Sequence, residues 1–191
     1  MTQMPTPATL HIRSATPSDA QSIAEVQVAS WQTTYARLLP RALIEAMTTG
    51  DRAQAWTKIL TTFDEGGLGA GYLCEAAGKP VGFATMGPQR DSELEALGFS
   101  AELTSIYLLE DMQRQGIGRV MMAQLAQAAK ARGHDSLAVW VIEGNQVARD
   151  FYAALGGVLV HQRFNPEEPD AVGEVAYGWR DLSALERRVT S

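Results

Sequence analysis

The sequence predicts a single α/β domain. The hydrophobic pattern alternates along the chain between the period of two typical of strands and the period near 3.6 typical of helices. The 191 residues, of which 46% are hydrophobic and 20% charged, match one globular domain rather than a disordered or fibrous chain. Because no repeat, linker or low-complexity tract divides the chain, residues 1–191 are expected to form one domain, with residues 1–7 as a frayed start.

Seven segments have the pattern of strands. The segment Ser136–Ile142 is almost entirely apolar, as expected for a strand that is buried on both faces. Ala77-Gly78-Lys79 separates two of the segments and predicts a hairpin turn, with glycine where a positive φ is needed. The seven segments are Leu10–Arg13, Gly71–Ala76, Pro80–Met86, Ala101–Leu109, Ser136–Ile142, Val158–Phe164 and Glu174–Trp179.

Helices are predicted between these strands from their start and stop residues. The first follows Thr16-Pro17-Ser18-Asp19, which supplies an N-cap, a proline at the first helical position and a carboxylate in the first turn. A second opens at Pro40, and Asp51 is expected to cap a third. A fourth runs from Gly116 to about Arg132, and Asn145 is expected to cap a fifth.

Composition excludes several classes of protein. The 16 Lys and Arg against 22 Asp and Glu give a net charge of −6, which argues against a nucleic-acid-binding protein. The single cysteine, Cys74, excludes an intrachain disulfide and is interpreted as a small buried hydrophobe. The most apolar run, Ala138–Ile142, is far shorter than the roughly 20 residues of a membrane span. With no zinc-ligand spacing among the histidines and no signal peptide, a cytoplasmic protein without a metal is expected.

The segment Gln113–Gly118 is the strongest candidate for a binding site. It lies between a predicted strand and a predicted helix, and Gly116 and Gly118 allow close approach to the backbone. The unpaired amides of the first helical turn and the helix dipole favour an anion such as a pyrophosphate. An ordinary turn is the alternative. A dinucleotide fold would need a third glycine where the sequence has Met121, so we set it aside.

Two further motifs accompany this loop. Gln113-x-x-Gly116-x-Gly118 after a hydrophobic strand resembles the acyl-CoA loop of the GNAT acetyltransferase superfamily. Asn145-Gln-Val-Ala-Arg-Asp-Phe-Tyr152 resembles the Asn-x-x-Ala-x-x-Phe-Tyr helix of that family. Ser30-Trp-Gln-Thr-Thr-Tyr35, followed by Leu38-Leu39-Pro40, is similar to the first-helix region of many bacterial members. The order of elements also agrees, so the resemblance covers residues 10–179.

The resemblance implies a mixed, mostly antiparallel twisted sheet of about seven strands, with helices on both faces and a splayed central parallel pair. Acetyl-CoA enters between that pair, here Ala101–Leu109 and Ser136–Ile142, and no metal is implied. The residues implied to contact acetyl-CoA are Ile106, Tyr107, Leu108, Gln113, Arg114, Gln115, Gly116, Ile117, Gly118, Arg119 and Asn145.

The resemblance also suggests catalytic residues. Glu102 lies eleven residues before Gln113, as the catalytic glutamate does in some members, and is the candidate base. Alternation places it on the strand face of Ile106 if no bulge intervenes. A solvated glutamate, with water chains moving the proton, is the alternative. Tyr152 is the candidate acid for the departing thiolate, and a core tyrosine is its alternative.

The acceptor is less defined by the sequence. Trp31 and Tyr35 lie one helical turn apart and either line the acceptor pocket or pack in the core. The acidic segment 91–95, predicted as a loop, either attracts a cationic acceptor or is simply solvated. The expected function is transfer of acetyl to a primary amine of a small molecule or peptide. The alternatives are an acyl-CoA sensor and a protein N-terminal or lysine acetyltransferase. No nucleic acid or membrane partner is expected, and a homodimer is left open.

Overall fold

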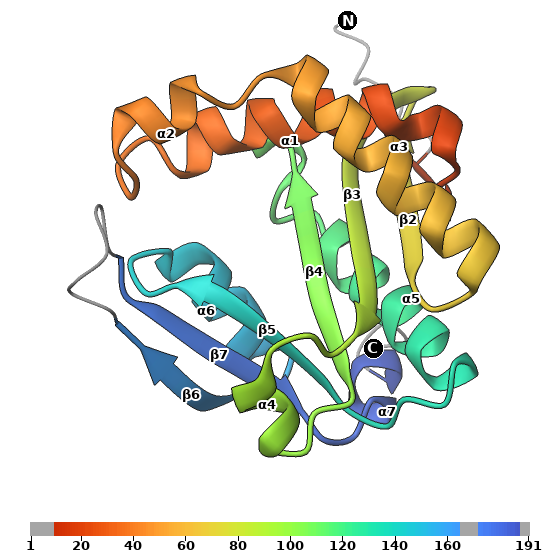
Figure 1. Ribbon diagram of the computed structural model, residues 1–191, viewed down its shortest axis with the longest axis vertical. Helices are drawn as coiled ribbons and strands as arrows, with labels where there is room; N and C mark the ends of the chain where they lie inside the picture. The colour runs from red at the N-terminus through yellow and green to blue at the C-terminus, as the bar shows by residue number, and fades with distance from the viewer. Residues whose placement is uncertain (1–9, 165–171, 188–191) are drawn as a thin grey trace, which may run out of the picture.

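The computed structural model describes residues 10–164 and 172–187 and contains one seven-stranded sheet in the order β1-β2-β3-β4-β5-β7-β6 (Figure 1). The predicted frayed start and the loop at residues 165–170 lie outside the described residues. Among the described strands every neighbouring pair is antiparallel except the parallel pair β4–β5. The strands are β1 Leu10–Ser14, β2 Ala70–Ala76, β3 Lys79–Pro88, β4 Ala101–Leu108, β5 Leu137–Ile142, β6 Val158–Arg163 and β7 Glu174–Trp179.

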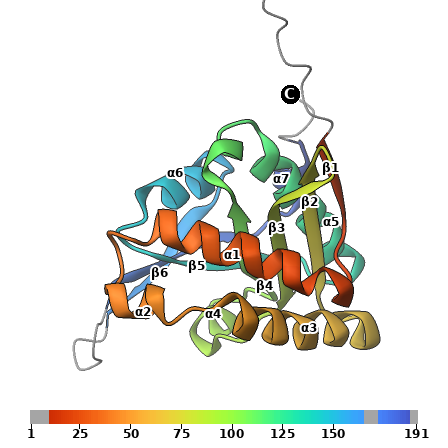
Figure 2. The same cartoon turned by 90° about the horizontal axis from the view of Figure 1, so that it is seen from above.

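Helices cover both faces of the sheet, as predicted (Figures 1 and 2). They are α1 Ala20–Thr34, α2 Arg41–Glu45, α3 Thr49–Gly66, α4 Ser92–Ala96, α5 Ile117–Ala131, α6 Gln146–Ala154 and α7 Ser183–Arg187, with short 3₁₀ turns at Pro17–Asp19 and Glu110–Met112. In the described part of the chain, no helix combines the length and apolarity required to cross a bilayer.

Two apolar clusters hold the layers together. Helices α1 and α3 pack side by side against β3, where Ile23, Trp56, Leu60 and Phe83 are almost fully buried. Helix α5 packs on the opposite face of the sheet, and its apolar stripe, which includes Met121, joins a cluster with the inward residues of β4, β5 and β7. Burying each such side chain contributes about 1.5–3 kcal/mol, so the amphipathic pattern of the sequence is sufficient to fix which helix face meets the sheet.

Strands β4 and β5 are paired only at one end. The register contains two pairs, Ala101 with Leu137 and Glu102 with Ala138. Beyond these pairs the two strands diverge, and β5 turns away from β4 toward α6 (Figure 1). The predicted splayed parallel pair is therefore confirmed. From Leu103 onward β4 is paired with β3 and not with β5.

A β-bulge interrupts the pairing of β3 with β4. Thr85 pairs with Ser105, whereas the next residue, Met86, pairs with Leu103. Thr104 is therefore an extra residue in β4, and its hydroxyl forms a hydrogen bond of 2.6 Å with that of Thr85. A bulge of this kind changes which side chains of a strand share a face.

The bulge changes the predicted faces of β4. Alternation without a bulge would place Glu102 and Ile106 on one face. In the structure Ile106 and Leu108 instead pack with Leu103 in the cluster on the α5 side of the sheet. The sequence placed Glu102 on the strand face of Ile106 only in the absence of a bulge. The inserted residue Thr104 shifts the alternation of side chains for the rest of the strand, so the two residues do not share a face.

The predicted hairpin between β2 and β3 is present. Ala77 and Gly78 form a two-residue turn with φ values of 50° and 76°. A type I′ hairpin turn needs positive φ at both central residues, and glycine accepts this without steric cost. The sequence thus identified the turn, although Ala77 shares the unusual conformation.

Two local features differ from the sequence predictions. The acidic segment at 91–95 is not only loop, because Asp91 caps the short helix α4 by accepting hydrogen bonds from the amides of Glu93 and Leu94. Leu94 is fully buried, which holds this helix against the sheet.

Helix α3 begins earlier than expected, because the Thr48 hydroxyl accepts from the Asp51 amide and serves as its N-cap.

Candidate active site

A cleft of about 1590 Å³ lies where β4 and β5 have parted. Residues of α1, α2 and the start of α3 form one wall, α6 forms another, and the loop before α5 lies at its foot. The structure brings together most of the residues predicted for the site. Those that line the cleft are Trp31, Tyr35, Ile106, Tyr107, Leu108, Gln113, Arg114, Gly116, Gly118, Arg119, Asn145 and Tyr152.

The loop before α5 has the backbone of an anion site. Arg114 and Gly116 both have positive φ, 59° and 82°, and Gly116 is the N-cap residue of α5. The Gly116 carbonyl accepts the first backbone hydrogen bonds of the helix, so the amides of Ile117 and Gly118 precede its hydrogen-bond ladder. A side chain at Gly118 would place its Cβ 3.0 Å from the Phe151 ring. The absence of a Cβ therefore lets α6 approach the foot of α5.

Strand β4 presents backbone groups to the gap. The Leu109 amide donates to the Val81 carbonyl in β3 across 2.9 Å. Because bonding alternates along an antiparallel ladder, the amide and carbonyl groups of Ile106 and Leu108 point away from β3. At these positions β5 is not paired with β4. The Gln113 side chain instead donates to the Leu108 carbonyl across 3.1 Å, which ties the loop to the end of the strand.

Aromatic side chains line the cleft between α1 and β4. The Trp31 indole donates to the Tyr107 hydroxyl across 3.0 Å, and the Trp31 and Tyr35 rings lie 4.9 Å apart. The Tyr35 hydroxyl interacts with the side chains of Tyr107 and Asn145. Trp31 and Tyr35 are therefore both packed together and in contact with the cleft, so the two interpretations of these residues are not exclusive.

Burial keeps the tyrosine hydroxyls in the cleft protonated. Desolvation raises the pKa of Tyr152, of Tyr107 and of Tyr35, since the phenolate form loses its solvation. The neighbouring Tyr107 hydroxyl raises the pKa of Tyr152 further. Tyr152 is 5% exposed, and its side chain meets the rings of Phe151, Tyr177 and Trp179 as well as the cleft. It is thus a core tyrosine and a cleft residue at once.

Asn145 connects helix capping with the cleft. Its side-chain oxygen accepts a hydrogen bond of 3.2 Å from the Ala148 amide, which confirms the predicted cap of α6. Asn145 is 7% exposed and lines the cleft opposite Tyr35. Its contact with the donor stays a prediction.

Three predicted site residues do not line the cleft. The Glu102 carboxylate pairs through both oxygens with the guanidinium of Arg90, at 2.9 Å each. Gln115 is exposed and donates to the Asp111 carbonyl, while Ile117 is 3% exposed and packs in the core. The amide of Ile117 remains at the helix start, whereas the side chain belongs to the core cluster.

The wall formed by α2 and the start of α3 was not predicted from the sequence. One signal was available, because Arg52 lies four residues before Trp56 and so shares the helix face of the apolar stripe on α3. A charged residue on such a face is directed toward the interior rather than into bulk solvent. The unforeseen lining residues of this wall include Leu38, Leu39, Leu43, Met47, Thr48, Asp51 and Arg52.

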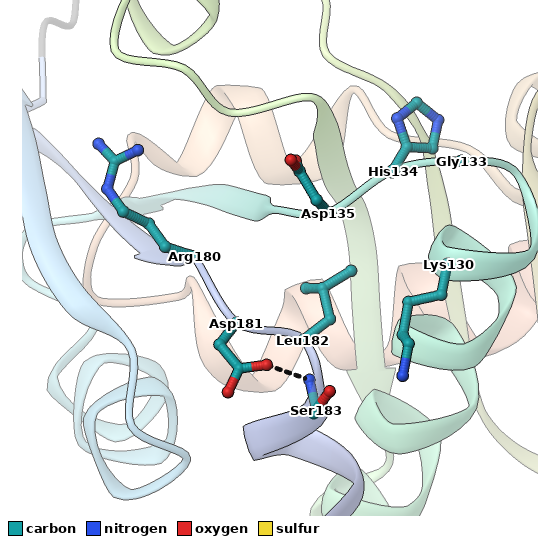
Figure 3. Close-up of a pocket in the computed structure, with 8 residues that line it drawn as sticks. All are labelled: Lys130, Gly133, His134, Asp135, Arg180, Asp181, Leu182 and Ser183. Carbon is teal, nitrogen blue, oxygen red and sulfur yellow. Dashed lines mark hydrogen bonds between the residues drawn. The ribbon is translucent and has the colours of Figure 1, made fainter.

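A second hollow of about 460 Å³ shares no lining residue with the cleft (Figure 3). Its charged groups are engaged with the protein itself. Lys130 pairs with Glu186 at 3.0 Å, Arg180 donates to the Leu97 carbonyl at 2.8 Å, and Asp181 accepts from the Ser183 amide at 2.9 Å. We therefore take the cleft between β4 and β5 as the candidate active site. Within the described residues, no group of three or more His, Cys, Asp and Glu is placed to hold a metal ion.

The fold is that of an α/β protein with a cleft between two parted parallel strands. The sequence model of the Acetyltransferase (GNAT) family matches residues 27–157. The uncharacterized N-acetyltransferase YuaI of Bacillus subtilis is 34% identical over 183 residues, which cover 91% of this chain and 95% of that protein. The chain therefore belongs to the GNAT family and is an N-acetyltransferase.

Solved structures agree with the fold. The PaiA N-acetyltransferase of Thermoplasma acidophilum, in complex with coenzyme A, aligns with a TM-score of 0.71 and 17% identity, over 90% of this chain and 99% of that one. YncA, a putative acetyltransferase of Salmonella typhimurium with its cofactor acetyl-CoA, aligns with a TM-score of 0.67 and 19% identity, over 91% and 94% of the two chains. At these identities the likeness concerns the fold alone.

Proposed function

We propose that this N-acetyltransferase moves acetyl from acetyl-CoA to a primary amine of a small molecule or peptide, by direct attack of the amine on the thioester. The observation that carries the proposal is the separation of β4 from β5 after two residue pairs, with a cleft that reaches the start of α5. One ligand can thereby contact the helix amides and the open edge of β4 together. Acetyl-CoA has the corresponding groups, because its diphosphate and its thioester lie at opposite ends of a thin arm.

The loop before α5 would hold the diphosphate. The amides of Ile117 and Gly118 open the helix, and the helix dipole adds positive potential at this end. Gly116, with a positive φ of 82°, gives the loop its shape. Arg114 and Arg119 line the same part of the cleft and supply positive charge. This part of the proposal concerns binding and not the chemical step.

The open edge of β4 would bind the thioester. The amides of Ile106 and Leu108 point toward the gap, and a hydrogen bond to the thioester oxygen stabilises the charge that develops there. A preorganised donor of this kind contributes about 3–4 kcal/mol in comparable sites. Acetyl-CoA supplies the activated acetyl group, and the protein supplies the orientation and the hydrogen bonds.

Tyr152 is the proposed acid. Its burial keeps the phenol protonated at neutral pH, and it lines the cleft from α6. The departing thiolate resembles a cysteine thiolate, whose thiol has a pKa of about 8.5, and it takes the proton on departure. For the base, Glu102 stays a sequence prediction. Its pairing with Arg90 and its position outside the lining residues favour the alternative, in which water accepts the amine proton.

Two other functions remain as alternatives. An acyl-CoA sensor would bind the donor without transfer, and a protein acetyltransferase would accept a chain terminus or a lysine. The family membership and the buried Tyr152 favour catalysis over sensing. The cleft, which opens along α1 and α2, does not by itself separate a small amine from a peptide. A cytoplasmic location and a homodimer stay predictions from the sequence.

The experiment has two stages. Isothermal titration with acetyl-CoA first measures donor binding, and absence of binding at millimolar donor would reject the proposal. A panel of amino acids, polyamines, aminoglycosides and short peptides is then screened for release of free CoA. Binding without release for any amine, in wild type and in Tyr152→Phe alike, would favour the sensor. Release that needs a peptide would favour the protein acetyltransferase.

A further inference from the structure

Arg52 brings a positive charge to the cleft, and no carboxylate of the described residues pairs with it. Among residues 10–164 and 172–187 no Asp or Glu forms an ion pair with its guanidinium. The neighbouring Asp51 also lines the cleft, but its carboxylate accepts from the Thr48 hydroxyl at 2.6 Å. A half-buried guanidinium with unused donors is favourable only if a ligand or water satisfies them.

The guanidinium is held in place by α1 and α3. Arg52 Nε donates to the Gln27 side-chain oxygen across 2.9 Å, and the same oxygen accepts from the Trp56 indole across 2.7 Å. Gln27 is 5% exposed and Trp56 2% exposed, so both partners are fixed in the core. The guanidinium carbon also lies 5.9 Å from the centre of the Trp56 ring. Of the guanidinium nitrogens, only Nε donates a hydrogen bond in these contacts. Neither Nη group donates to another described residue.

Arg52 lies on the wall of the cleft that is formed by α1, α2 and the start of α3. Its charge acts on the Tyr107 hydroxyl and opposes the rise of the Tyr107 pKa that burial causes. Tyr107 lies on β4 between Ile106 and Leu108, the residues whose amides face the gap. The loop with Arg114 and Arg119 lies beyond the end of β4, whereas Arg52 lies at the start of α3, so Arg52 is a positive group separate from that loop.

We propose that the acceptor is an amine that also carries a carboxylate, such as an amino acid or the end of a short peptide, and that Arg52 binds this carboxylate. The inference rests on the proposed function and narrows its acceptor. A planar guanidinium, whose two Nη groups donate to no described residue, matches a carboxylate in a bidentate geometry. A polyamine, in contrast, would bring a second cation close to an unpaired cation. The apolar side chains of Leu39, Leu43 and Met47 line the same wall and suit an apolar amino-acid side chain.

The test compares each amino acid with its own amide. The amides of L-methionine, L-leucine and L-phenylalanine keep the amine and the side chain but lack the negative charge. At saturating acetyl-CoA, wild type is expected to show a higher kcat/KM for the acids. Arg52→Gln should lower kcat/KM for the acids by about 30-fold or more and change that for the amides less than threefold. Arg52→Lys should fall between the two, since a lysine keeps the charge but not the fork.

Arg37→Gln is the matched control, because Arg37 also lines the cleft but is exposed. It should leave the preference for acids unchanged. Equal use of acids and amides by wild type would overturn the inference. An equal loss on both series in Arg52→Gln would overturn it as well.

A binding measurement separates this inference from the proposed function. The enzyme saturated with CoA is titrated with N-acetyl-L-methionine and with N-acetyl-L-methioninamide. Preferential binding of the acid that Arg52→Gln abolishes supports the inference even where turnover is too slow to measure. No preference, or no binding of either compound, contradicts it. Failure of acetyl-CoA itself to bind would instead reject the proposed function.

Discussion

The indole nitrogen of Trp31 and the hydroxyl oxygen of Tyr107 are joined by a hydrogen bond of 3.0 Å. The bond connects α1 to β4 in the stretch where β4 has left β5. Tyr107 thus has its side chain fixed to α1, while its two neighbours in β4 present their backbone to the gap. Tyr107 therefore joins the wall formed by α1 to the open edge of β4.

Tyr152→Phe is expected to lower kcat by about 10²–10³-fold and to change acetyl-CoA affinity less than twofold. The substitution removes the proton donor and keeps the ring contacts with Tyr177 and Trp179. Burial raises the pKa of Tyr152 above its usual value of about 10. This phenol should therefore remain protonated up to about pH 10, and its ionisation should not lower the rate at any pH below that value.

Steady-state kinetics and calorimetry measure these two effects. Tyr177→Phe is the control, since Tyr177 is 8% exposed, contacts the Tyr152 ring and does not line the cleft. A kcat for Tyr152→Phe within threefold of wild type would remove Tyr152 from the mechanism.

Gly116→Ala is expected to weaken acetyl-CoA binding, whereas Gly133→Ala should not. Both glycines have positive φ, 82° and 83°, and in the described part of the chain no atom beyond their chain neighbours and local helix backbone lies within 4 Å of an added Cβ. The backbone strain, about 1–2 kcal/mol, is therefore the same for the two. Thermal denaturation should show similar losses, and titration should show lower affinity only for Gly116→Ala. Equal affinities of the two variants for acetyl-CoA would show that the loop at Gly116 does not contribute to donor binding.

Glu102→Gln is expected to change kcat/KM less than threefold. Both carboxylate oxygens pair with Arg90, whose side chain is 71% exposed, so the pair is worth at most about 1 kcal/mol. Loss of a general base would instead lower the rate by about 10²–10⁴-fold. Arg90→Gln tests the ion pair separately. A hundredfold loss of kcat/KM in Glu102→Gln, without such a loss in Arg90→Gln, would establish Glu102 as the base that the sequence suggested.

Asp19 is expected to contribute stability that acid removes. Hydrogen bonds from Arg13, at 2.7 and 2.9 Å, lower the pKa of Asp19 to about 2. A folded pKa below the unfolded value of 3.8 means that the contribution is complete above about pH 5 and is lost as the pH falls toward 2. Asp19→Asn should lower the free energy of unfolding by about 2 kcal/mol at pH 7.

Urea denaturation of both proteins at pH 7, 5, 4 and 3 measures the effect of Asp19. The difference between them should be constant from pH 7 to 5 and smaller at pH 3. A difference that does not depend on pH would mean that the carboxylate charge is not responsible.

Ser30→Ala is expected to preserve stability or to raise it by up to about 1 kcal/mol. The Ser30 hydroxyl oxygen is buried and has no hydrogen-bond partner among the described residues, so its removal loses no bond. Ser136→Ala is the matched case, because the Ser136 oxygen accepts from the Ser100 amide at 3.0 Å. This second change should cost about 1–3 kcal/mol. Similar unfolding midpoints for the two variants would contradict the assignment.

Features set by neighbouring residues were predictable from the sequence. The seven strands, the Gly78 turn, the loop with Gly116 and the Asn145 cap all depend on local conformational preferences. Side-chain alternation and helical periodicity then fix which faces are buried. The parted strands followed from the family resemblance and not from these local rules.

Features set by contacts between distant segments were not predictable. The extra residue Thr104 depends on the register of β4 against β3, which the β4 sequence alone does not reveal. The pairing of Glu102 with Arg90 depends on where the loop after β3 folds back. The position of Arg52 in the cleft required α3 to pack on α1, and a pattern within α3 gave only the helix face.

The parting of β4 from β5 also affects how backbone groups of the sheet are exposed to a strand of another chain. An unpaired strand edge normally invites another chain to extend the sheet. Here two such edges belong to the middle of the sheet, and the cleft between them is walled by α1, α2 and α6. A thin, flexible molecule can reach these backbone groups, whereas a foreign strand would meet the surrounding helices first. The fold thus keeps unpaired backbone groups of β4 and β5 in the middle of the sheet, where the surrounding helices shield them from another strand.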